Sequence, residues 1–182
     1  LNPSMITIGD AEKAAGLGGV MGGLLTEVTG ETKNVILEAA SFHGPSIRRT
    51  SRALGLRSDA SGRFERGVDP NAQLYALKCA ALMAKELAGA KVSMQIADTC
   101  PEPTPGFPGE LKYAYVDGLV GQHIPAETVR SIVTSLEMEI REENAEGLSL
   151  VVPPYRVDVQ RPCDVVEDIL RIYGYNQVEI PT

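Results

Sequence analysis

The chain has 182 residues, a mass of 19.5 kDa and a formal net charge of -7. Hydrophobic residues make up 43%, which excludes a disordered chain, and no apolar stretch approaches the roughly 18 residues of a membrane-spanning helix. Membrane insertion is therefore excluded. The acidic balance argues against a protein whose whole surface binds nucleic acid, so such binding would need a local basic face.

Cysteine usage and the chain start indicate the cellular setting. Cys79, Cys100 and Cys163 are odd in number and far apart, which argues against a disulfide framework or a zinc knuckle. A cytoplasmic location fits these thiols best. The chain starts at Leu1 without an initiating Met or a signal segment. We therefore expect a piece of a longer cytoplasmic polypeptide.

The first hundred residues mix short strands with helices. Five glycines within residues 16–23 predict a loop, but their spacing misses both the dinucleotide motif and the P-loop. This loop is expected to let the backbone pack tightly or line a pocket. Apolar patterning predicts strands at 6–8, 34–39 and 92–96 and helices at 45–54 and 69–88, the second capped by Asp69. The continuous run Val35-Ile36-Leu37 predicts burial on both faces.

A proline-rich linker is expected at 101–110, because proline recurs there too often for a helix or a central strand. It separates a domain at 1–100 from a smaller one at 111–182. The second domain is predicted to contain a strand at 111–116, a helix at 126–136, a hairpin at 138–142 and 148–152, and a helix at 162–173. This order resembles a winged-helix module. The predicted fold class is α+β, a mixed α/β fragment followed by a small winged-helix-like domain.

Arginine is concentrated in residues 48–66, which carry a net charge of +4 on an acidic chain. Arginine makes bidentate contacts with phosphate, so this segment is a candidate RNA-binding face. A solvated helix face with local ion pairs is the alternative.

Glu38 ends an apolar run, where a carboxylate is costly unless it has a partner. A buried carboxylate can accept a hydrogen bond from a ligand hydroxyl and so discriminate against a ligand that lacks one. The alternative is a surface residue at a strand end.

Four acidic residues gather near the last predicted helix. Asp164, Glu167 and Asp168 share one helical face, and Asp158 precedes them. Like charges at this spacing repel, so another group must offset them. Oxygen ligands without His or Cys suit magnesium. The alternative is a set of carboxylates that stabilise the N-terminus of the helix.

Several stretches together resemble the family of the bacterial phenylalanyl-tRNA synthetase beta subunit. They are Gly18-Gly19-Val20-Met21-Gly22-Gly23, Asn34-Val35-Ile36-Leu37-Glu38-Ala39-Ala40, Ser58-Asp59-Ala60-Ser61-Gly62-Arg63-Phe64-Glu65-Arg66-Gly67-Val68-Asp69-Pro70 and Asp164-Val165-Val166-Glu167-Asp168-Ile169-Leu170-Arg171-Ile172-Tyr173-Gly174-Tyr175. The resemblance implies that residues 1–100 are most of an editing domain, which hydrolyses tyrosine wrongly attached to phenylalanine tRNA.

The same resemblance assigns roles to individual residues. Glu38 would recognise the tyrosine hydroxyl, Gly22 would form the pocket wall, and Ala60 would leave room for the ring. Ser58 stands where the family is expected to have Thr. The editing histidine of the family lies upstream of this chain, so the catalytic group is unknown and the pocket is incomplete. The candidate tRNA contacts are Arg48, Arg49, Arg52 and Arg57.

The resemblance also implies partners and cofactors. Asp158, Asp164, Glu167 and Asp168 match ligands for Mg²⁺ shared with the alpha subunit, although Asp168 stands where Glu is frequent. The parent would use ATP at the alpha-subunit site and work as an alpha2-beta2 heterotetramer on tRNA(Phe), and this chain alone would not aminoacylate. A non-catalytic RNA- or protein-binding module that shares the fold is the alternative.

Overall fold

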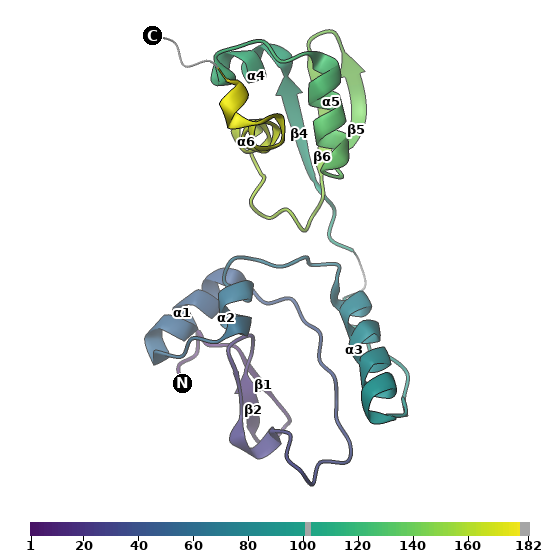
Figure 1. Ribbon diagram of the computed structural model, residues 1–182. Helices are drawn as coiled ribbons and strands as arrows, with labels where there is room; N and C mark the ends of the chain where they lie inside the picture. Colours follow the sequence, from purple (N-terminus) through teal and green to yellow (C-terminus); the bar gives the residue numbers. More distant parts are fainter. Residues whose placement is uncertain (101–102, 179–182) are drawn as a thin grey trace. The chain divides into compact units, whose positions relative to one another are not determined.

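The computed structural model describes residues 1–100 and 103–178 and divides into two compact units, with the boundary between residues 102 and 103 (Figure 1). Each unit combines helices with a small antiparallel sheet, which confirms the predicted α+β class. Within the described ranges, no helix is both long enough and apolar enough to cross a membrane.

Unit 1 begins with a three-stranded antiparallel sheet in the order β1-β2-β3. Its strands are β1 (Thr7–Gly9), β2 (Ala14–Leu17) and β3 (Met21–Gly22), so the glycine-rich segment forms a tight hairpin as well as a loop. The 3-10 helix η1 (Leu24–Thr26) follows. The helices are α1 (Gly44–Leu54), α2 (Asp59–Phe64) and α3 (Gln73–Ala88). The predicted helix at 45–54 is confirmed.

The buried core of unit 1 is small. Among its described apolar residues, Val20 and Ile47 are buried, and they are joined by the buried polar residues Thr50, Ser51 and Ser61. Every residue of the fully described helix α3 keeps some exposure, and Leu82 and Leu87 are mostly exposed. Unit 1 therefore leaves extensive apolar surface uncovered.

Two predicted strands of unit 1 are wrong. Residues 34–39 and 92–96 form no strand (Figure 1). Ile36 is 95% exposed instead of buried on both faces. A strand needs a neighbour to bond its backbone groups, and no described strand pairs with either segment. The apolar run is present without the partner that would bury it.

The start of α3 also differs from the prediction. The helix begins at Gln73 rather than after Asp69, and Ala72 occupies the capping position. The Asp69 Oδ1 atom accepts a hydrogen bond from the Asn71 N–H at 2.9 Å. This local bond closes a turn before the helix, because an aspartate side chain can bond the backbone two residues on.

Unit 2 contains a three-stranded antiparallel sheet in the order β4-β6-β5. Its strands are β4 (Phe107–Lys112), β5 (Glu139–Asn144) and β6 (Gly147–Val152). Its helices are α4 (Tyr113–Val120), α5 (Ala126–Ser135) and α6 (Pro162–Tyr173), followed by the 3-10 helix η2 (Tyr175–Gln177). The hairpin and the helices predicted at 126–136 and 162–173 are confirmed.

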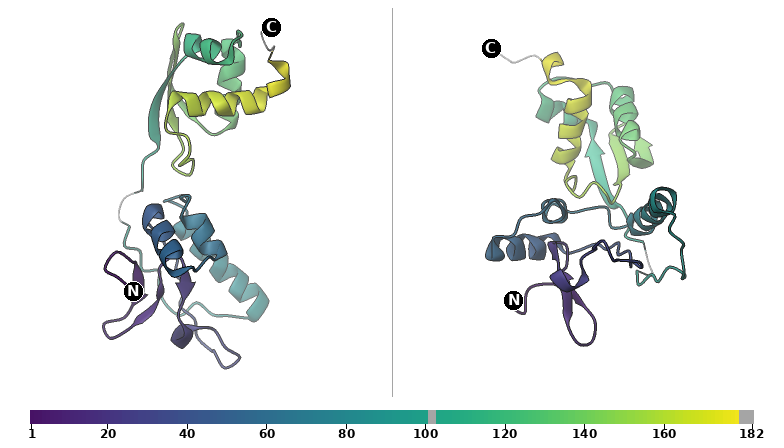
Figure 2. Two further views of the ribbon diagram at one scale, coloured as in Figure 1. Left: turned by 90° about the vertical axis from the view of Figure 1, so that its left-hand side faces the viewer. Right: turned by 60° about the horizontal axis from the view of Figure 1, so that its bottom comes forward.

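The helices of unit 2 cover one face of its sheet (Figure 2). The side chains between these helices and the sheet form a continuous apolar core, in which Val116, Val129, Val133, Val166 and Ile169 are fully buried. Residues on α6 recur at helical spacing, so one side of this helix is apolar and packs inward. This core makes unit 2 the better-packed half of the chain.

The predicted strand at 111–116 is wrong in its bounds. Residues 107–112 form β4, and residues 113–120 form α4, which buries Val116 and Val120 one turn apart. Part of the expected linker therefore belongs to the sheet, while residues 101 and 102 lie outside the described residues. Pro108 is tolerated because β4 is an edge strand, where a missing N–H costs no ladder bond on the open side.

A pair of substitutions on α6 tests this packing. Ile169→Ala should lower the free energy of unfolding of unit 2 by about 2–5 kcal/mol, because it leaves a cavity at a fully buried position. Ile172→Ala, at a position 52% exposed on the same helix, should change it by only about 0.5 kcal/mol. Urea unfolding measures both, and equal effects would contradict the described burial.

Candidate functional site

A cavity of about 980 Å³ lies within unit 1. The β2–β3 hairpin, the extended segment before α1, helix α2 and the start of α3 all contribute to its lining. Three predicted pocket residues, Gly22, Glu38 and Ala60, line this one cavity. The chain therefore brings together residues that lie up to 38 positions apart in sequence.

Glycines allow the hairpin to lie against an aromatic side chain. A Cβ atom at Gly18 would lie 2.9 Å from Phe42 Cε1, and one at Gly19 would lie 2.9 Å from Phe42 Cδ2. Gly19 also has φ +67°, a backbone conformation that favours glycine. At Gly22 a Cβ atom would meet nothing within 4 Å, so a side chain there would take up open space at the cavity wall.

Ser58 supports the cavity instead of lining it. Its hydroxyl donates a 2.6 Å hydrogen bond to the Val20 carbonyl, at the tip of the glycine hairpin. The same oxygen accepts a 3.1 Å bond from the Ser61 N–H, and the Ser61 hydroxyl accepts a 2.9 Å bond from the Ser58 N–H. This reciprocal capping box starts α2. Ser58 thus joins the hairpin to the helix that carries Ala60.

Two aromatic residues complete the described lining near Ala60. Phe42 and Phe64 line the cavity, and their rings meet edge to face with centroids 5.0 Å apart and planes at 78°. Asp69 and Gln73 also line it, and Gln73 Nε2 donates a 3.1 Å bond to the Asp69 carbonyl. These four residues were not among the predicted site residues. Their closeness to the motifs around Glu38 and Ala60 was the available signal.

Glu38 is exposed, which agrees with the alternative of a surface residue, although no strand ends there. Its carboxylate makes no hydrogen bond or ion pair with any other described residue. It lies on the wall of the cavity and can therefore accept a hydrogen bond from a bound ligand without first releasing a protein partner.

The four candidate tRNA contacts lie on or directly after α1. Arg48, Arg49, Arg52 and Arg57 are all exposed, and within the described part of the chain none of them forms an ion pair. Arg49 Nη2 donates a 3.3 Å bond to the Ser46 hydroxyl. These residues form a solvated helix face, but, among the described residues, without the local ion pairs of the alternative prediction, so the basic face keeps its charge and tRNA binding stays a prediction.

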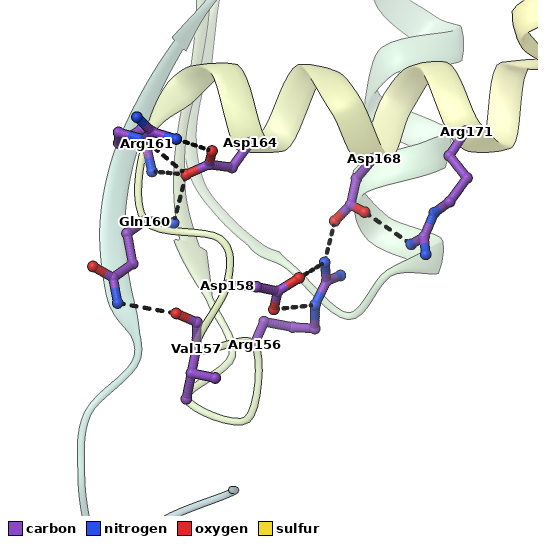
Figure 3. Close-up of polar contacts among 8 residues, drawn as sticks. All are labelled: Arg156, Val157, Asp158, Gln160, Arg161, Asp164, Asp168 and Arg171. Atoms are coloured by element: carbon purple, nitrogen blue, oxygen red, sulfur yellow. Dashed lines mark hydrogen bonds and ion pairs between the residues drawn. The ribbon is translucent and has the colours of Figure 1, made fainter. Parts of the chain in front are cut away.

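Three carboxylates of the predicted acidic set form ion pairs with arginines (Figure 3). Asp158 accepts two bonds from Arg156, at 3.1 Å from Nε and 2.9 Å from Nη2. This bidentate pair lowers the pKa of Asp158 and raises that of Arg156, chiefly through the hydrogen bonds that join them. Asp168 is buried at the middle of α6 and contacts Arg156 and Arg171.

Asp164 caps the start of α6. Its Oδ2 atom accepts bonds from the backbone N–H groups of Arg161 and Gln160 at 2.8 and 3.2 Å, and its Oδ1 atom accepts from Arg161 Nη2 at 2.8 Å (Figure 3). These bonds, led by the one from the Arg161 side chain, hold the pKa of Asp164 far below its usual range. This is the helix-terminus role that the sequence offered as an alternative to metal binding.

As folded here, these carboxylates do not fit a magnesium ion. No group of three or more His, Cys, Asp or Glu side chains suited to a metal occurs among the described residues. Arginine cations already occupy the carboxylates of Asp158, Asp164 and Asp168, and Glu167 is exposed without an ion pair or hydrogen bond to any described residue. A magnesium site shared with a second subunit stays a prediction of the family resemblance.

Comparisons with known proteins match both units. A B3/4 domain model matches residues 1–89, and a tRNA synthetase B5 domain model matches residues 110–175. The chain is 57% identical over all 182 residues to the phenylalanine--tRNA ligase beta subunit of Bacteroides fragilis strain YCH46, and 42% identical over 180 residues, 99% of the chain, to that of Moorella thermoacetica. The relative from Porphyromonas gingivalis is 44% identical over 162 residues, 89% of the chain. The chain spans 22%, 22% and 20% of these three relatives.

The two hydrogen bonds of the Ser58 hydroxyl can be tested by substitution. Ser58→Ala removes both the cap of α2 and the bond to the hairpin, so it should destabilise unit 1 by about 1–2 kcal/mol. Ser58→Thr keeps the hydroxyl and should stay close to the parent. Urea unfolding compares the variants. A Ser58→Ala chain as stable as the parent would remove the structural role described for this hydroxyl.

Proposed function

The chain belongs to the family of the bacterial phenylalanyl-tRNA synthetase beta subunit, and we propose that unit 1 carries most of the site that hydrolyses mischarged Tyr-tRNA(Phe). The observation that carries this proposal is the meeting of Glu38, Gly22 and Ala60 on one cavity. A pocket with an open wall, a small residue and an unengaged carboxylate at Glu38 suits an aromatic acyl group that bears a hydroxyl.

The chemistry of tyrosine and phenylalanine explains why a second site is useful. The two amino acids differ by one hydroxyl, and an apolar pocket built for phenylalanine rejects an added hydroxyl only weakly. A site that hydrogen-bonds this hydroxyl discriminates in the opposite direction, because tyrosine gains a bond to the acceptor that phenylalanine cannot make. Glu38 supplies such an acceptor on the cavity wall.

In this proposal the residues of the chain bind and orient the substrate. Glu38 accepts the phenolic O–H, Ala60 and Gly22 leave space for the ring, and the edge-to-face pair of Phe42 and Phe64 offers it an aromatic surface. The water that attacks the ester carbonyl would be activated by a group outside these 182 residues. Glu38 is accordingly a specificity residue and not the hydrolytic one.

The whole subunit would complete this pocket. The exposed apolar surface of unit 1, which includes Ile36 and Leu87, supports cover by further polypeptide of the same subunit. Aminoacylation of tRNA(Phe) with phenylalanine, ATP and Mg²⁺ would take place at the alpha subunit of a cytoplasmic alpha2-beta2 heterotetramer. The structure assigns no step of that reaction to this chain.

Binding of tRNA would use the basic face of α1. Arg48, Arg49, Arg52 and Arg57 are exposed and make no ion pair with other described residues, so their charge is available to phosphate groups. A non-catalytic RNA-binding module would use the same face. The convergence of Glu38, Gly22 and Ala60 on one cavity favours the editing function over that alternative.

The role of Glu38 predicts a specific loss of editing. In the whole beta subunit with its alpha partner, Glu38→Ala should slow hydrolysis of Tyr-tRNA(Phe) by about 1–3 kcal/mol of transition-state binding, about 5- to 150-fold. Aminoacylation with phenylalanine should be unchanged, because that reaction uses another site. Deacylation rates on mischarged tRNA measure the effect.

Glu31→Ala is the matched control for this experiment. Glu31 is also an exposed glutamate in the segment before α1, but it does not line the cavity. Its substitution should leave deacylation at the parent rate. Equal rates for Glu38→Ala and Glu31→Ala would contradict the proposed specificity role.

A further inference from the structure

Asp168 is the charged residue most deeply placed in unit 2. Its side chain is 7% exposed, and each of its two oxygens contacts a different arginine. Asp168 Oδ1 accepts a 2.8 Å bond from Arg171 Nη2, one turn further along α6. Asp168 Oδ2 lies 2.7 Å from Arg156 Nη2, an ion pair that crosses from α6 to the loop before it (Figure 3).

Arg156 connects two carboxylates across this loop. Its guanidinium holds Asp158 by two bonds and also pairs with Asp168, and its side chain is 17% exposed. Asp168 Oδ2 accepts no hydrogen bond of good geometry from the described residues, so charge attraction to Arg156 stabilises this buried oxygen. A planar guanidinium suits such a double contact better than an ammonium group would.

Three of the four carboxylates of the acidic set are paired with arginines. Arg156, Arg161 and Arg171 provide three positive charges to Asp158, Asp164 and Asp168, and every one of these pairs has a contact of 2.9 Å or less. A magnesium ion would have to displace the arginines that already form ion pairs with its expected ligands. Magnesium also gives up its water reluctantly, which adds to that cost.

We propose that Arg156 and Arg171 clamp the carboxylate of Asp168, and that this arginine clamp takes the place that a magnesium ion would otherwise fill beside α6. The clamp fixes residues 153–161 against the helix. Arg156 is thus a positioning residue, and Glu167 is the one member of the acidic set left without an arginine. The inference does not depend on the editing function proposed for unit 1.

Neutralising one carboxylate distinguishes an arginine clamp from a metal site. Carboxylates that await a metal repel one another in its absence, so Asp168→Asn would then stabilise the metal-free chain. A carboxylate held by two arginines behaves in the opposite way, because its loss takes from the mostly buried Arg156 guanidinium one of its two carboxylate partners. The two accounts therefore predict changes of opposite sign.

The test follows heat unfolding of unit 2 in the 182-residue chain through the NMR methyl signals of Val166 and Ile169, with millimolar magnesium or with EDTA. The parent should unfold at the same temperature in both. Asp168→Asn should lower the midpoint by an amount on the order of 10 °C. Glu167→Gln, an acidic residue of the same helix outside the clamp, should leave it unchanged.

Two further measurements keep the proposal falsifiable if Asp168→Asn does not fold. Arg171→Met removes one exposed arm of the clamp and should lower the midpoint by a few degrees. Arg141→Met, at a similarly exposed arginine whose partner Glu139 is also exposed, should not. The double variant Arg156→Met with Asp168→Asn should lose less than the sum of the two single losses.

Opposite results would overturn the proposal. A parent midpoint that rises with magnesium, with the rise lost in Glu167→Gln, would show a metal site in this chain. A higher midpoint for metal-free Asp168→Asn would show repelling carboxylates instead of a clamp. Strictly additive losses for Arg156→Met and Asp168→Asn would show that the two side chains do not act as a pair.

Discussion

The candidate site depends on the two hydrogen bonds of the Ser58 hydroxyl. It bonds the carbonyl of Val20 in the glycine hairpin and caps α2 through Ser61, so one oxygen fixes two elements 38 residues apart. With the hairpin and α2 joined, Gly22 and Ala60 can line the same cavity, and Phe42 can pack beneath the glycines. The departure from the expected Thr at this position keeps the atom that makes both bonds.

The two units differ in how their folds are stabilised. Unit 2 has a continuous apolar core, and arginines balance the acidic residues at α6. Unit 1 buries few apolar side chains, and several of the residues that line its cavity are exposed. This contrast agrees with the proposal that unit 1 is completed by other polypeptide of the same subunit, whereas unit 2 folds around its own core.

Local patterns predicted the elements that need no distant partner. The helix predicted at 162–173 has these bounds in the structure, and the hairpin predicted at 138–142 and 148–152 forms as β5 and β6. The run Val35-Ile36-Leu37 misled because burial on both faces requires neighbouring strands, which residue type alone does not supply. Glu38 follows this run and is exposed, which agrees with the alternative of a surface residue.

The site residues show the same limit. The spacing of Asp164, Glu167 and Asp168 placed them correctly on one helix, but counting carboxylates overlooked the arginines beside them, which decide how their charge is balanced. The cavity lining also needed the fold, since Phe42, Phe64 and Gln73 carry no chemical signature of their own. Gly22, Glu38 and Ala60 were found because their motifs resemble a family.

The central claim is that Glu38 recognises a phenolic hydroxyl in this cavity. The direct measurement is calorimetric binding of non-hydrolysable tyrosyl- and phenylalanyl-adenosine amides to the whole beta subunit with its alpha partner, with the aminoacylation site saturated by phenylalanine. If Glu38 recognises this hydroxyl, the tyrosyl compound should bind more tightly, and this preference should be lost in Glu38→Ala, which has no side-chain acceptor. Equal affinities of the two compounds in the parent protein, or an unchanged preference in the variant, would contradict it.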